Sequence, residues 1–284
     1  MTIDKIIEAA LKEDIGSGDH SSILSVDADA KGEAQLIAKE NGIVAGIDIA
    51  MRVFKQIDQS LEIEPLLQDG MTVQKGFVLM KVSGRIRSIL SAERLVLNIM
   101  QRMSGIATLT SHYCQLIEGT HARLLDTRKT TPNFRVLEKM AVRIGGGYNH
   151  RMGLYDMIML KDNHIDFAGG IENAIKKAIE YKTQNQLTLA IEIETRSLSD
   201  VEKVMDLGGV DQIMFDNFSV EDVRKAVKMV NGCFKTEASG NINEKTIRSY
   251  AETGVDYISV GALTHSVKSL DISLGAVKKR GEMV

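Results

Sequence analysis

The residues best suited to chemistry in this sequence are four cations that follow apolar runs or glycines. Arg128 and Lys129 come after "RLLDT", Arg151 follows a triple glycine, and Lys161 comes directly after "DMIML". Arginine offers a planar, permanently charged fork for carboxylates or phosphates, and lysine offers a compact point charge. The formal net charge of the chain is −3, so these cations indicate a local anion site and not a bulk polyanion surface.

Two acidic residues, Glu194 and Asp216, end two later apolar runs. Such carboxylates could hold Mg²⁺, which is usually bound by few protein carboxylates together with substrate oxygens and water. Structural salt bridges to the same lysines and arginines are the alternative, and the pattern alone leaves both open. Cysteine and histidine spacing typical of structural zinc is absent from the sequence.

Small residues end the last two apolar runs, in "EASGN" at 237–241 and "SVGALTH" at 259–265. Ser239, Gly240 and Gly261 would let backbone N–H groups approach an anion closely, and His265 could donate to the same group. Barrel enzymes often bind a phosphate after their final strands. These two segments therefore predict a phosphate cup.

Six strand-like runs separated by helical segments must position these residues. The runs are "RLLDTRK", "DMIMLKDNH", "LTLAIEIETR", "VDQIMFDN", "KTEASGN" and "DYISVGALTH". Alternating strands and helices predict a parallel sheet, and six such units favour a closed or nearly closed barrel. A doubly wound open sheet is the competing architecture, but it concentrates chemistry at one switch point, whereas here every strand end carries polar residues.

Helix boundaries can also be read from the sequence. Ser199 and Ser219 are predicted N-caps, each with an acidic residue three positions later. Thr131 and Pro132 are predicted to start a helix that the glycines at 145–147 end. The chain would then turn back, so Arg128 and Arg151 are expected to approach one another.

The first hundred residues differ from the rest and predict a smaller α+β (α/β sandwich) domain over residues 1–108. Its last helix is expected to be broken or kinked near Ser104-Gly105. The β/α barrel would occupy 109–270, and residues 271–284 are expected to pack back on the first domain.

The sequence has no basic, apolar start typical of a signal peptide, no apolar run of about 20 residues, and two cysteines, Cys114 and Cys233. These features predict a cytoplasmic protein without a membrane partner. Aromatic residues do not alternate with the basic ones, so nucleic acid is not an expected partner.

The segments "DTRKTTP", "GGGYNHRMGLYDMIMLKDNHI", "EASGNI" and "GVDYISVGALTHS" resemble the hallmark segments of quinolinate phosphoribosyltransferases. The resemblance continues upstream through "ALKEDIGSGDHSS" and "SAERLVLNIMQRMSGIAT" and covers almost the whole chain. It implies an N-terminal α/β domain, an incomplete β/α barrel, and at least a homodimer with shared active sites. It also implies that phosphoribosyl pyrophosphate (PRPP), quinolinate and Mg²⁺ give nicotinate mononucleotide, pyrophosphate and CO₂ in NAD biosynthesis.

The resemblance implies roles for individual residues. Arg128, His150, Arg151 and Lys161 would hold the quinolinate carboxylates, with Arg102 of the neighbouring subunit completing that site. Thr127, Lys129 and Lys161 would face PRPP, and Glu194 and Asp216 would act through Mg²⁺ and the ribose. Lys129, Lys161, Glu194 and Asp216 would be the catalytic residues. Ser239, Gly240, Asn241, Gly261 and His265 would surround the 5′-phosphate.

Three departures from the family pattern are Asn133 and Asn241, where glycine is usual, and Arg196 beside the acids. Three rival functions also remain. They are a related phosphoribosyltransferase acting on another pyridine, a Schiff-base aldolase using Lys161, and a biotinyl-like binding module over "DGMTVQKGFVLMKVSG".

Overall fold

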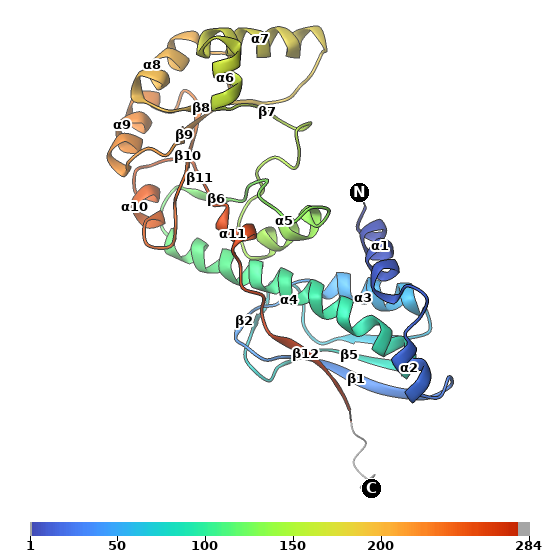
Figure 1. The fold of residues 1–284 in the computed structure, drawn as a ribbon. Helices are drawn as coiled ribbons and strands as arrows, with labels where there is room; N and C mark the ends of the chain where they lie inside the picture. Colours follow the sequence, from blue (N-terminus) through green and yellow to red (C-terminus); the bar gives the residue numbers. More distant parts are fainter. Residues whose placement is uncertain (1, 278–284) are drawn as a thin grey trace. The chain divides into compact units, whose positions relative to one another are not determined.

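The protein is described by a computed structural model over residues 2–277, and it divides into two compact units (Figure 1). Within the described residues, unit 1 comprises 2–111, 130–146 and 266–277, and unit 2 comprises 112–129 and 147–265. By compactness, residues 130–146 and 266–270 therefore join unit 1, although they lie inside the range expected for the barrel. The expected boundaries at 108 and 270 stay a prediction.

Unit 1 contains a four-stranded antiparallel sheet with the order β12-β1-β5-β3. Its strands are β1 (Lys31–Ala38), β3 (Glu62–Pro65), β5 (Val78–Arg85) and β12 (Ile272–Ala276), and a separate pair joins β2 (Gly42–Ile43) and β4 (Thr72–Val73). The last residues of β1 alternate between buried and partly exposed, which is the pattern of a sheet with one covered face. Pairing of β12 with β1 brings residues 272–276 into this unit, whereas 278–284 lie outside the described residues.

The helices of unit 1 are α1 (Ile3–Ile15), α2 (His20–Ser25), α3 (Ile47–Ile57), α5 (Arg135–Ile144) and most of α4 (Ile86–Leu116). The expected break of α4 near Ser104-Gly105 is wrong, because the helix runs through without interruption. A Cβ atom on Gly105 would lie 2.3 Å from the Lys268 carbonyl oxygen. The glycine therefore permits close approach of another chain segment and does not end the helix.

Unit 2 is built on a parallel six-stranded sheet with the order β6-β11-β10-β9-β8-β7. The strands are β6 (Arg123–Leu125), β7 (Ile158–Leu160), β8 (Ile191–Thr195), β9 (Gln212–Asp216), β10 (Lys235–Ser239) and β11 (Tyr257–Ser259). Each strand matches one of the six runs predicted from the sequence. The spatial order follows the chain order around a ring, broken between β6 and β7. This topology is an incomplete β/α barrel and confirms the predicted fold class.

Helices cover the outer side of these strands (Figure 1). They are α7 (Ile171–Gln184), α8 (Leu198–Leu207), α9 (Val220–Val230) and α10 (Ile247–Ala251), whereas the short helices α6 (Asp162–Ala168) and α11 (Ala262–His265) follow the ends of β7 and β11. Ser219 caps α9 as predicted, by accepting from the Asp222 amide. The Ser199 prediction is wrong: Ser197 caps α8, because the extended conformation needed at an N-cap falls there.

The helix between the two cationic segments is shorter than predicted. Thr131 and Pro132 precede it, and α5 begins at Arg135. Thr131 instead donates its amide and hydroxyl groups to the buried carboxylate of Glu138. Gly145 ends the helix as predicted, and Gly146 follows with a φ of +94°. Among residues 2–277, no helix is both long and apolar enough to cross a membrane.

Candidate active site

A cavity of about 850 Å³ lies at the carboxyl ends of the unit 2 strands. Its wall contains every site residue predicted from the sequence except Arg102. They are Thr127, Arg128, Lys129, His150, Arg151, Lys161, Glu194, Asp216, Ser239, Gly240, Asn241, Gly261 and His265. The carboxyl ends of parallel strands meet at one end of a barrel, so residues that end or follow the six strands line the same cavity. Residues 150 and 151, from the loop before β7, complete its wall.

The two arginines of the cavity come from chain segments that the backbone holds side by side. The Tyr148 amide donates to the Leu124 carbonyl at 2.8 Å, and the Asp126 amide donates to the Tyr148 carbonyl at 3.1 Å. This pairing extends the sheet edge, with Arg128 two residues beyond Asp126 and Arg151 three beyond Tyr148. Burial lowers the pKa of Arg151, and the charge of Arg128 lowers it further. The expected approach of the two cations is confirmed.

The loop that follows β6 and carries Lys129 is held in place by contacts with the segment that follows β11. The Thr264 hydroxyl donates to the Lys129 carbonyl at 2.8 Å. A Cβ atom on Gly261 would lie 3.0 Å from the His265 ring and from Cδ of Lys129. Glycine at 261 therefore lets Lys129 and His265 approach the same part of the cavity.

The predicted phosphate cup depends on unusual backbone angles. Gly240 has a φ of +96°, and a Cβ atom there would lie 2.3 Å from Oδ1 of Asn217. Asn241 has a φ of +53°, and its side-chain amide donates to Oδ1 of Asn217 at 3.0 Å. Asn133, the other departure from glycine, has a φ of +62°. Asparagine tolerates this left-handed region better than most residues, so both departures keep the backbone shape.

Glu194 is engaged by the segment that follows β7. Its carboxylate forms a salt bridge with Nζ of Lys161 and accepts from the Asp162 amide at 3.3 Å. The side chain is only 9% exposed. Glu194 thus forms the salt bridge that the sequence left as one alternative, and its role toward Mg²⁺ stays a prediction. Asp216 accepts from its neighbour Asn217 at 2.8 Å, also at the cavity wall.

Arg196 lies away from the main cavity. It pairs with Asp166 at 2.6 Å and also donates to the Asp162 carbonyl. With Asp200 it lines another hollow of about 620 Å³, formed by residues of α6, α7 and α8 and the β8–α8 loop, which shares Glu194 with the main cavity. This departure therefore does not alter the wall that carries the predicted cations.

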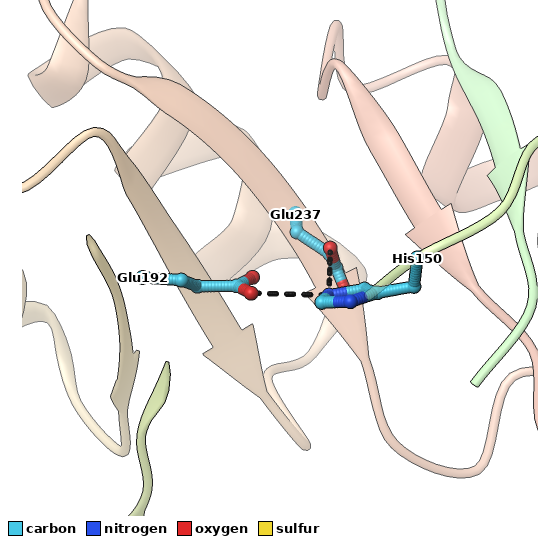
Figure 2. Close-up of side chains that lie close together, drawn as sticks. All are labelled: His150, Glu192 and Glu237. Carbon is cyan, nitrogen blue, oxygen red and sulfur yellow. Dashed lines mark ion pairs between the residues drawn. The ribbon is translucent and has the colours of Figure 1, made fainter. Parts of the chain in front are cut away.

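His150 lies between two buried carboxylates (Figure 2). Its Nε2 atom is 3.0 Å from Glu192 and 3.4 Å from Glu237. Burial lowers the pKa of His150, but the hydrogen bonds and charges of the two glutamates outweigh it and raise the pKa to about 10. Burial and the charge of Glu192 raise the pKa of Glu237 to about 7.

The sequence interpretation missed Glu192 and Glu237, although a signal was present. Successive side chains of a strand alternate between its faces, so residues two apart point the same way. Glu192 precedes Glu194 by two positions, and Glu237 precedes Ser239 by two. Each of these apolar strands thus contains a glutamate two positions before a predicted site residue, on the same face. That pattern could have identified both glutamates as part of the site.

Arg102 belongs to unit 1, on α4, and is absent from the cavity wall described above. Its Nε and Nη2 atoms donate to Oε1 of Glu138 at 3.0 and 2.9 Å. The predicted role of Arg102 concerns the site of a neighbouring subunit, and it stays a prediction.

Comparison with known proteins gives one consistent result along the chain. The N-terminal domain model of quinolinate phosphoribosyl transferase matches residues 19–104, and its C-terminal domain model matches 106–275. A chloroplastic nicotinate-nucleotide pyrophosphorylase [carboxylating] of Oryza sativa subsp. japonica is 48% identical, over 95% of this chain and 76% of its own. A probable nicotinate-nucleotide pyrophosphorylase [carboxylating] of Bacillus subtilis is 43% identical, over 96% and 93%.

Solved structures agree with these matches. The crystal structure of NadC from Streptococcus pyogenes superposes with a TM-score of 0.91 at 40% identity, covering 97% of both chains. The nicotinate-nucleotide pyrophosphorylase of Francisella tularensis gives a TM-score of 0.88 at 38% identity, covering 97% of this chain and 96% of its own. The chain thus belongs to the quinolinate phosphoribosyltransferase family.

Proposed function

We propose that this protein transfers the phosphoribosyl group of PRPP to quinolinate and releases pyrophosphate and CO₂, forming nicotinate mononucleotide for NAD biosynthesis. One observation carries the proposal. A single cavity combines the paired cations Arg128 and Arg151 with a loop of small residues around Gly240. The first feature suits a dicarboxylate, and the second suits a sugar phosphate.

The two substrates would occupy different parts of the cavity. Quinolinate would place its carboxylates against Arg128, His150 and Arg151, with Lys161 within reach. PRPP would place its 5′-phosphate at the loops holding Ser239, Gly240, Asn241, Gly261 and His265, and its pyrophosphate toward Thr127 and Lys129. A dicarboxylate can offer one carboxylate to each of the two arginines, which favours it over a monocarboxylate.

The chemistry follows from the charges around the reacting carbon. As pyrophosphate leaves C1 of the ribose, that carbon becomes electron-poor, and Lys129 and Lys161 would stabilise the leaving oxygens. The quinolinate nitrogen, positioned through its carboxylates, then bonds to C1. Positioning alone contributes about 7–11 kcal/mol in favourable cases. The C–COO⁻ bond then breaks beside the positive ring nitrogen, CO₂ leaves, and the ring carbon takes up one proton.

Mg²⁺ belongs to the proposal as a partner of PRPP. Asp216 offers a carboxylate at the cavity wall, whereas both oxygens of Glu194 already have protein partners, Lys161 and the Asp162 amide. This donor set would fit an ion bound mainly by pyrophosphate oxygens and water, with Asp216 and Glu194 as the protein carboxylates that would hold it. When bound, the ion would neutralise charge on the leaving pyrophosphate.

We also propose a homodimer, or a larger homo-oligomer, in which Arg102 serves the site of the neighbouring subunit. Mixing two weakly active variants, Arg102→Ala and Lys161→Met, tests this arrangement. If sites are shared, one mixed site recovers both intact residues, and activity rises above that of either variant alone. Equal activity before and after subunit exchange would count against sharing. A cytoplasmic location stays part of this proposal.

The rivals receive less support. Nζ of Lys161 is paired with Glu194, whereas a Schiff-base aldolase needs that nitrogen free to attack a carbonyl. The segment 69–84 contributes β5, which pairs with β1 on one side and β3 on the other, so it serves the sheet of unit 1.

The decisive experiment measures pyrophosphate and CO₂ release with quinolinate, nicotinate and nicotinamide offered separately. We expect both products with quinolinate alone, and their loss when EDTA removes Mg²⁺. Turnover of nicotinate but not quinolinate would reject the substrate assignment, and full activity in EDTA would reject the metal.

A further inference from the structure

A largely buried acidic network reaches the cavity wall at His150 and Glu237, and its members other than His150 have no role in the reaction above. We call it the His150 cluster: His150, Glu192, Gln212 and Glu237. The Gln212 side-chain amide donates to Oε1 of Glu192 and to Oε2 of Glu237, at 2.8 Å each. The side chains come from β8, β9 and β10, and His150 reaches them from the segment before β7, as Figure 2 shows for the histidine and the two glutamates.

The position of these acids makes a purely structural role unattractive. Glu192 and Glu237 are both 0% exposed, in a layer that barrels usually fill with valine, isoleucine or leucine. Burying charged groups is costly, and apolar residues of similar volume often stabilise a protein at least as well. The network therefore needs an explanation in the site that it adjoins.

The histidine at its centre is constrained from both ring nitrogens. Nε2 forms ion pairs with the two glutamates, and Nδ1 accepts the backbone N–H of Arg151 at 2.7 Å. The ring is therefore held at both nitrogens, with Nε2 facing the two carboxylates and Nδ1 facing the Arg151 backbone. On the other side, the His150 amide donates to the buried Asp126 at 2.9 Å.

The same network acts on the charge of Arg151. The positive charge of Arg128 disfavours a second guanidinium nearby, and the negative charge of Glu192 counteracts that effect. The cluster thus acts on Arg151 in two ways. The His150 ring contacts the Arg151 backbone, and the negative charge of Glu192 acts on the Arg151 guanidinium group. Arg151 is 8% exposed, and Nη1 of its guanidinium group donates to the Met157 carbonyl at 3.3 Å.

We propose that Glu192, Gln212 and Glu237 are positioning residues for the dicarboxylate substrate. They hold the His150 ring, and through it they present Arg151 beside Arg128 at the spacing that two carboxylates require. This inference rests on the proposed quinolinate-binding role of His150 and Arg151. Displacement of a positioned group by about 1 Å can cost about a hundredfold in rate.

The test uses Glu237→Gln, Glu192→Gln and the double variant, which keep side-chain size and remove charge. Asp256→Asn is the matched control, because Asp256 also accepts from a neighbouring strand, through Thr236, but lies outside the cavity wall. Arg151→Lys is the reference for the substrate site itself. For each protein, we would measure the KM values for quinolinate and PRPP, kcat, the melting temperature, and the ¹⁵N shifts of the His150 ring by NMR.

We expect the double variant to raise the quinolinate KM about tenfold to a hundredfold, with the PRPP KM changed less than about twofold. The His150 nitrogen shifts should move, because Nε2 no longer faces two carboxylates. The control should change neither the KM values nor the His150 shifts, whatever its melting temperature.

The possible failures are distinguishable. If Arg151→Lys raises the quinolinate KM and the glutamine variants lower only the melting temperature, the substrate site stands and this inference is overturned. An equal rise in both KM values would also overturn it, because a general distortion would explain that result. If Arg151→Lys leaves the quinolinate KM unchanged, the proposed substrate site itself is wrong.

Discussion

Replacement of Glu138 by glutamine should be among the most destabilising single changes of charge in unit 1. Glu138 is 0% exposed on α5, and its carboxylate accepts four hydrogen bonds. Oε1 receives Nε and Nη2 of Arg102 and the Thr131 hydroxyl, and Oε2 receives the Thr131 amide. A glutamine that keeps its oxygen toward Arg102 must direct its own NH₂ group at the Thr131 N–H. The glutamine NH₂ group and the Thr131 N–H, both donors, then face each other in the protein interior.

The size of the effect can be worked out from these contacts. An unsatisfied buried donor costs about 1–3 kcal/mol, and removal of one partner of a buried ion pair costs about 3–5 kcal/mol in total. The Arg102 side chain is 25% exposed, so water can solvate part of its charge and the lower half of that range applies. We therefore expect a loss of about 3–4 kcal/mol, or roughly 6–16 °C in melting temperature for a chain of this size.

Urea unfolding followed by circular dichroism, together with calorimetry, measures this loss. Glu13→Gln is the control, because Glu13 is an exposed residue of α1 and its replacement should change stability by less than about 0.5 kcal/mol. A loss below about 1 kcal/mol for Glu138→Gln would refute the reasoning, since it would mean that the four hydrogen bonds do not act together. The quinolinate KM should also rise if Glu138 orients Arg102 for a neighbouring subunit.

Three further predictions concern the cavity and the acid stability of unit 1. Lys161→Met should lower the rate of pyrophosphate release about a hundredfold or more, because it removes a stabilising cation and leaves the Glu194 carboxylate without its salt-bridge partner. Lys228→Met, on the surface of α9, should leave that rate unchanged. Gly240→Ala should raise the PRPP KM about tenfold, since its Cβ would meet Asn217 at 2.3 Å, whereas Gly232→Ala, with a φ of +77° and open space, should leave that KM unchanged. Asp58→Asn should destabilise the protein at pH 7 and progressively less below about pH 4. The hydrogen bond from Arg85 holds the pKa of Asp58 well below its usual range. The ionised Asp58 therefore stabilises the folded protein above its unfolded pKa, and this stabilisation is lost as the pH falls. If urea titrations gave the same stability difference between the two proteins at every pH, this reasoning would be wrong.

The sequence determined the architecture of the barrel and most of its site because both depend on local patterns. Apolar runs of strand length, separated by helical segments, are sufficient to predict six parallel strands, and parallel strands place their carboxyl ends together. Lys161, Asp216 and Ser239 were therefore predicted to share a cavity from position in the chain alone. Glycine and asparagine at 240 and 241 likewise indicate a left-handed turn by their residue types, because both tolerate a positive φ.

Only the tertiary structure decided which partners these groups have. Glu194 could have bound a metal or a cation by its sequence, and the fold joins it to Lys161. Gly105 was predicted to break or kink a helix, but it permits a close approach of residue 268, which no local pattern records. Glu192 and Glu237 meet around His150 because β8 and β10 lie on either side of β9, and that meeting depends on contacts between residues far apart in the chain. Local propensity sets the elements, whereas the burial and pairing of charges follow from packing between them.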